Sequence, residues 1–131
     1  MNRDQYIEAF RELHPDTPVV VKGNRWEDVE TPGVQKPDNS TLASVFIEKK
    51  KAEKISELKE KYLQVCYTTD NEYLKELKRK DAGIAKEKDT TDKQAALDRY
   101  KNATIEYEEK KMLIENSKDT DSLEKISVEV E

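Results

Sequence analysis

The N-terminal residues show the spacing of apolar positions that is typical of a helix. Residues 3–13 read RDQYIEAFREL, and their apolar side chains fall on one stripe with charged side chains opposite: Tyr6, Ile7, Phe10 and Leu13. Pro15 and Pro18 follow, and each disfavours a helical conformation in the residue before it. The pattern predicts a short amphipathic helix over residues 3–13.

A β-branched run comes next and predicts a β-hairpin over residues 18–30. From Thr17 the chain reads TPVVVKGNRWEDV, with Gly23 and Asn24 between two apolar runs. Glycine and asparagine tolerate the positive φ angles of a two-residue hairpin turn. Because a lone hairpin is only marginally stable in water, we expect it to pack against the first helix. The expected small core consists of Tyr6, Phe10, Leu13, Val19, Val21 and Trp26.

The character of the chain changes between Trp26 and Leu42. The segment from Pro32 to Ser40 is rich in proline and polar residues and predicts a linker, with a helix N-cap at its end. Before it lie the only Trp and the only His, and after it the sequence is dense in charge. We therefore predict a small α+β head of residues 1–36 and a charged helical tail of residues 37–131.

The pattern of apolar positions in the tail predicts four helices, at about residues 40–67, 70–87, 92–116 and 120–127. The first two are separated at Thr68, Thr69 and Asp70, whose side chains can cap a new helix. Spacings of three and four residues, typical of a coiled-coil seam, relate Ile55, Leu58, Tyr62 and Val65; Tyr100 and Tyr107 are one heptad apart. The predicted fold is mainly α, with a helical hairpin or coiled-coil-like tail formed within one chain or across a homo-oligomer.

Composition limits the kind of core and the kind of partner. The chain is 40% charged and 34% hydrophobic, which favours thin seams between helices over one large core. Its net charge of -5 argues against general binding to nucleic acid or to an anionic membrane surface. We also expect no membrane insertion, because no apolar run approaches the ~18 residues that span a bilayer.

The inventory of reactive side chains argues against an enzyme. His14 and Cys66 are the only residues of their types, so they can form neither a zinc site nor, without crossing the linker, a nucleophile pair. His14 is interpreted as a helix-end residue and Cys66 as a small packing residue. We expect no catalytic residue, no cofactor and no metal.

Five segments give the chain a recognisable layout: a short helix ending in ELHP, the hairpin VVVKGNRWEDV, the cap KPDNSTL, the helix IEKKKAEKISELKEKY and the late SLEKI. This layout resembles that of small tail accessory and tail-fibre assembly proteins of tailed bacteriophages and PBSX-like prophages. It implies a component of the virion tail, baseplate or fibre, or a chaperone of fibre assembly, that binds a tail-fibre or baseplate protein. It also implies a location in the host cytoplasm during assembly or in the virion tail.

The residues expected to make protein contacts come from both parts of the chain: Trp26, Val29, Ile55, Leu58, Tyr62, Tyr100 and Tyr107. Trp26 is open to two interpretations, as core filler or as an exposed binding anchor. The alternative function is a small helical adaptor or regulatory protein that binds an unrelated protein partner.

Overall fold

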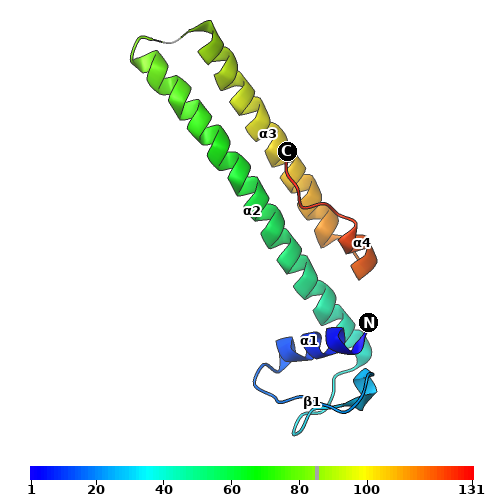
Figure 1. Ribbon diagram of the computed structural model, residues 1–131. Coiled ribbons are helices and arrows are strands. Elements are labelled where there is room, and N and C mark those ends of the chain that lie inside the picture. The colour runs from blue at the N-terminus through cyan, green and yellow to red at the C-terminus, as the bar shows by residue number, and fades with distance from the viewer. Residues whose placement is uncertain (85) are drawn as a thin grey trace. The chain divides into compact units, whose positions relative to one another are not determined.

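The computed structural model describes residues 1–84 and 86–131, with the backbone alone for residues 87–90. It is mainly helical, with a short N-terminal helix and a small two-stranded hairpin before the long helices (Figure 1), and this confirms the predicted fold class. The chain divides into two compact units, an N-terminal unit of residues Met1–Ala52 and a C-terminal unit of residues Glu53–Glu131. Each unit is described by itself.

The first helix of the N-terminal unit, α1, covers Arg3–Leu13 as predicted. Its start is fixed by a capping box, in which Asn2 and Gln5 exchange backbone and side-chain hydrogen bonds of 2.9 and 3.0 Å. Its end lies at His14, whose backbone N–H donates to the carbonyl of Phe10 before Pro15 stops the helix. Local sequence signals therefore determine both ends.

The hairpin pairs β1 (Val20–Val21) with β2 (Val29–Glu30) in antiparallel register. The predicted two-residue turn at Gly23 and Asn24 is wrong, because the connection also contains a 3-10 turn, η1 (Trp26–Asp28). The Asp28 side chain accepts the backbone N–H of Arg25 at 3.3 Å, and the Asp28 N–H donates to the Arg25 carbonyl. This local hydrogen bonding keeps Trp26 out of the strand to which the pattern assigned it.

The core of the N-terminal unit draws on α1, the hairpin region and the beginning of α2 (Asn39–Asp81). Its buried apolar residues are Ala9, Phe10, Trp26, Val29, Leu42 and Phe46. The unit therefore extends to Ala52 and not to residue 36 as predicted, because Leu42 and Phe46 of the long helix complete its core. Leu13 and Val21 were expected in this core but are exposed.

Helix α2 is continuous, so the predicted break at Thr68, Thr69 and Asp70 is wrong. The two threonine hydroxyls donate to the carbonyls four residues earlier, Gln64 and Val65, at 3.0 Å each. Their hydrogen bonds are thus satisfied inside the helix instead of capping a new one. The helix ends before Gly83, whose φ of +74° is the left-handed conformation common after a helix C-terminus.

The C-terminal unit also contains α3 (Glu87–Glu115) and α4 (Thr120–Glu124). Helix α3 starts earlier than the predicted residue 92, and α4 ends before the predicted residue 127. Beyond α4, partly buried apolar residues alternate with exposed polar ones. This last segment lies along α3 (Figure 1, red). The core of this unit comprises Leu58, Ile114 and Leu123, with Ile55, Tyr107, Ile126, Val128 and Val130 packed against them.

Candidate protein-binding surfaces

Two of the residues expected to contact a partner are buried in the N-terminal unit. Trp26 and Val29 are 4% and 1% exposed. The Trp26 ring stacks on Tyr6 at 5.7 Å between ring centroids, and the Lys36 ammonium lies 4.6 Å from the centroid of the indole ring. Lys36 also donates to the Trp26 carbonyl at 2.8 Å. The structure therefore gives Trp26 the core role, the first of its two interpretations, and leaves it unavailable as a surface anchor.

Four further expected residues meet each other within the chain. Ile55 and Leu58 pack into the core of the C-terminal unit. Tyr62 of α2 stacks on Tyr107 of α3, with ring centroids 4.7 Å apart and an angle of 15° between the ring planes. The Tyr62 hydroxyl is hydrogen-bonded to the Thr104 hydroxyl at 2.8 Å. The seam is thus formed between α2 and α3 of one chain, and of the seven predicted contact residues Tyr100 is the one that stays exposed.

The hydroxyl of Tyr62 has an unusual environment for a tyrosine. The hydrogen bond with Thr104 acts to lower its pKa, but desolvation and the neighbouring Cys66 and Tyr100 outweigh it and raise the pKa of Tyr62 to about 12. The Tyr62 hydroxyl therefore stays protonated well above physiological pH, and through its hydrogen bond with Thr104 it links α2 to α3.

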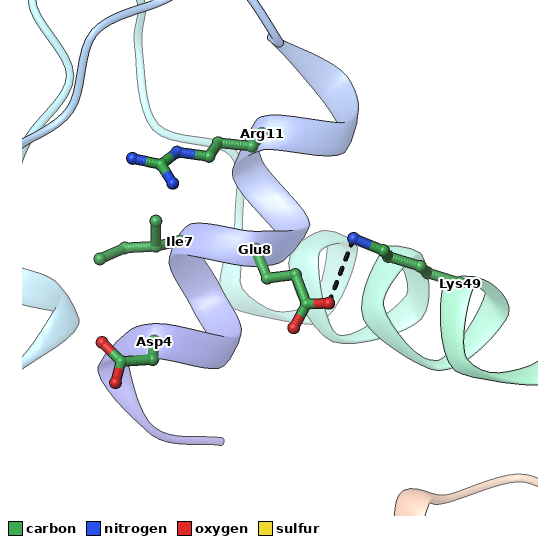
Figure 2. A pocket seen from close by; sticks show the side chains of 5 residues that line it. All are labelled: Asp4, Ile7, Glu8, Arg11 and Lys49. Atoms are coloured by element: carbon green, nitrogen blue, oxygen red, sulfur yellow. Dashed lines mark ion pairs between the residues drawn. The ribbon is translucent and has the colours of Figure 1, made fainter. Parts of the chain in front are cut away.

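A hollow on the N-terminal unit, of about 450 Å³, is lined by one side of α1 and by Lys49 of α2. Lys49 forms ion pairs with Glu8 at 3.1 Å and with Glu12 at 2.9 Å. Figure 2 shows Glu8 turned toward Lys49, whereas Ile7 and Arg11 point away from this ion pair. Since these side chains do not converge on one point, the ion pairs serve to join α1 to α2.

The ion pairs of this hollow shift the pKa values of their members in the stabilising directions. A hydrogen bond from Lys50, at 3.1 Å, is the largest influence and lowers the pKa of Glu8. Hydrogen bonds with Glu12 and then Glu8 raise the pKa of Lys49. Both ends of the network are therefore charged at neutral pH, which favours the docked position of α1.

The C-terminal unit exposes large apolar side chains that the sequence analysis assigned to no surface. On α2 these are Leu63, Tyr67 and Leu74, separated by four and seven residues, and Tyr67 is 76% exposed. On α3, Ile105 and Met112 are exposed seven residues apart. Residues at these spacings share one side of a helix. Such stripes are the side chains best placed to meet another protein.

These stripes were not predicted from the sequence, because the periodic apolar residues of each helix were interpreted as a single seam. A detectable signal was present. Leu63, Tyr67 and Leu74 each precede by two positions a residue that is buried in the seam: Val65, Thr69 and Glu76. A shift of two residues turns the side chain by about 200°, to the other side of the helix. The buried set and the exposed set of apolar positions together indicate a helix with a contact face on each side.

The described residues contain no group of three or more His, Cys, Asp or Glu side chains that is arranged to hold a metal ion. Within the same residues, no helix combines the length and apolar character needed to cross a membrane. No protein-family model, curated protein or solved structure matches the chain. Function is therefore inferred from the surfaces of the chain itself.

Proposed function

We propose that this protein acts by binding another protein, as a small accessory protein of a bacteriophage tail. In this role it is a component of the tail, baseplate or fibre, or a chaperone of fibre assembly in the host cytoplasm. The tail assignment rests on the resemblance in layout from ELHP to SLEKI. The observation that carries a binding function is the outward apolar stripe of α3, formed by Ile105 and Met112.

This α3 stripe is separate from the packing of α3 inside its own unit. Ala103 and Ile114 of the same helix are fully buried, whereas Met112 is 62% exposed. Two carboxylates, Glu108 and Glu109, lie in the turn between Ile105 and Met112. An apolar stripe with acidic residues beside it is complementary to a partner surface of apolar side chains flanked by lysine or arginine.

Capture of a partner from co-expressed proteins tests this proposal. The tagged chain is co-expressed with the tail-fibre or baseplate protein encoded nearest to it, and the complex is isolated and quantified. Met112→Lys replaces an apolar member of the stripe with a charge, and we expect it to weaken capture by about tenfold or more. Leu113→Lys is the matched control, since Leu113 is 57% exposed but points about 100° away around the helix.

The results separate the possible functions clearly. A complex that is weakened by the Met112 substitution and retained by the Leu113 substitution supports the proposal. Absence of any complex, with both proteins intact and folded, contradicts it. Capture of an unrelated cellular protein in place of a tail protein would favour the adaptor alternative.

A further inference from the structure

The outer side of α2 carries a regular stripe of exposed residues that its own chain does not use for packing. We call this set the α2 stripe, and it consists of Glu60, Leu63, Tyr67, Asn71, Leu74 and Lys78. Successive members are three or four residues apart, so they follow one side of the helix. Its apolar members are 48% (Leu63), 76% (Tyr67) and 53% (Leu74) exposed.

The α2 stripe lies opposite the side of α2 that packs inside the C-terminal unit. Leu58, Val65 and Thr69 are buried on that inner side. Leu63 and Tyr67 stand two positions before Val65 and Thr69, which places them about 200° around the helix from these buried residues. Packing of α2 within its own unit therefore cannot cover the stripe.

The α2 stripe is complementary to a second α2 stripe that runs in the opposite direction. One end carries the acid Glu60 next to Leu63, and the other end carries the base Lys78 next to Leu74. When a second copy is laid antiparallel, Leu63 faces Leu74 of the second copy and Glu60 faces Lys78 of the second copy. A two-fold axis near the middle of the stripe repeats both contacts. A parallel arrangement would instead bring like charges together.

We infer that two copies of this chain associate through the α2 stripe, with their α2 helices antiparallel. This contact is independent of which tail or other protein the α3 stripe binds. The hollow beside the stripe agrees with a second copy as the occupant, and the small size of the contact sets the expected affinity.

A hollow of about 430 Å³ adjoins the α2 stripe and is lined by Asn71, Leu74, Lys75, Lys78 and Arg79. Tyr67 is the most exposed large apolar side chain of the described residues. In the antiparallel arrangement Tyr67 of the second copy lies over Asn71, at the edge of this hollow. An aromatic ring suits a surface of this kind, because its edge packs on Leu74 and its face attracts the surrounding cations.

The area of the α2 stripe indicates a weak dimer. A contact of one helix with one helix, centred on three apolar side chains from each copy, buries less than the ~1,200 Å² typical of stable specific interfaces. We therefore expect association in the micromolar range or weaker, about 1 µM to 1 mM, and dissociation on dilution. Leu63, Tyr67 and Leu74 become covered only when the chain is concentrated.

Sedimentation equilibrium of the full chain over a concentration series tests the dimer. We expect the average mass to rise from the 15.2 kDa of one chain toward twice that value. Leu74→Lys should weaken association by about tenfold or more. Leu113→Lys, a similar substitution at an exposed position of α3 outside both stripes, should leave it unchanged. Circular dichroism of each variant verifies that the helices are intact.

Charge reversal tests the antiparallel register. Glu60→Lys and Lys78→Glu should each weaken the dimer by about tenfold, because each places two like-charged pairs at the interface. The double variant, Glu60→Lys with Lys78→Glu, should restore wild-type association. A chain that remains monomeric throughout the series, or a dimer that the double variant fails to restore, overturns the inference. Either result leaves the α3 stripe and its capture experiment unaffected.

Discussion

Replacement of Phe10 by alanine should strongly destabilise the N-terminal unit while leaving the helices of the C-terminal unit in place. Phe10 is fully buried, with its ring centroid 5.1 Å from that of His14 and 6.1 Å from that of Trp26. Truncating a buried phenylalanine to alanine typically costs about 3–5 kcal/mol of unfolding free energy. The loss includes both the burial of the ring and the cavity that it leaves.

The cost is large compared with the stability of so small a unit. At about 0.05–0.15 kcal/mol per residue, residues 1–52 have a free energy of unfolding of about 3–8 kcal/mol. Phe10→Ala therefore removes roughly half of the stability or all of it. Leu13→Ala is the control on the same helix, because Leu13 is 41% exposed and its truncation should cost about 1 kcal/mol or less.

Two spectroscopic signals separate the units in one urea titration. Trp26 is the only tryptophan and lies in the N-terminal unit, so its fluorescence reports that unit alone. Far-UV circular dichroism follows total helix, most of which lies in α2 and α3. We expect Phe10→Ala to shift the fluorescence midpoint far to lower urea with the main dichroism transition retained. A fluorescence shift no larger than that of Leu13→Ala would refute a core centred on Phe10.

Three further predictions concern hydrogen bonds and pH. Tyr62→Phe removes the 2.8 Å hydrogen bond to Thr104 and should lower the unfolding free energy by about 0.5–1.5 kcal/mol. Urea titrations followed by circular dichroism measure this change. Tyr67→Phe is the control, because Tyr67 is exposed and its substitution should leave the unfolding free energy unchanged. The pKa of Tyr62 is raised from 10.0 to about 12, so the contribution of Tyr62 to the free energy of unfolding is complete below pH 10 and is lost as the pH rises toward 12. An unfolding free energy that stays constant over that pH range would contradict this. The hydrogen bond from Lys50 lowers the pKa of Glu8 from 4.5, so the contribution of Glu8 is present above pH 4.5 and is lost as the pH falls through the lowered value. Glu8→Gln should therefore reduce the acid sensitivity of the Trp26 fluorescence midpoint, and an unchanged profile would exclude this ion pair as the cause.

Elements determined by local signals could be predicted from the sequence. Helix α1 has its cap at Asn2, its apolar stripe and Pro15 within a few residues of one another, and its predicted bounds are confirmed. The mainly helical class is also confirmed, because apolar periodicity over long segments is the strongest pattern that a sequence carries. Neither conclusion required knowledge of distant contacts.

The features that the sequence analysis misjudged depend on competing local hydrogen bonds or on distant packing. Thr68 and Thr69 could equally cap a new helix or bond back to the preceding turn, and the structure shows the second. The boundary of the N-terminal unit lies at Ala52 because Leu42 and Phe46 pack against α1 residues more than thirty positions earlier. A pattern read along the chain does not reveal such contacts.

The candidate surfaces were predicted less well than the fold, for a physical reason. Apolar residues at helical spacing satisfy the same pattern whether they face a core or solvent, so Trp26 and Leu58 could not be distinguished from surface anchors. Tyr100 was placed in the seam; it neighbours the Tyr62 hydroxyl at the edge of the seam, but it is 42% exposed. A residue in a core and a residue on the surface differ in whether a neighbouring helix covers them, and only the structure gives the position of that helix.

The distribution of buried residues along α2 gives a reason for its exposed stripe. Toward the core of the C-terminal unit the inner side of α2 presents Leu58, whereas further along it presents Thr69 and Glu76. Burial of polar side chains contributes less to stability than burial of apolar ones, so Thr69 and Glu76 contribute less on this side than Leu58 does. The large apolar residues of this later part of α2, Tyr67 and Leu74, lie on the outer side instead. Since a partner that binds the folded state adds its binding free energy to stability, association through the α2 stripe would further stabilise this part of the helix.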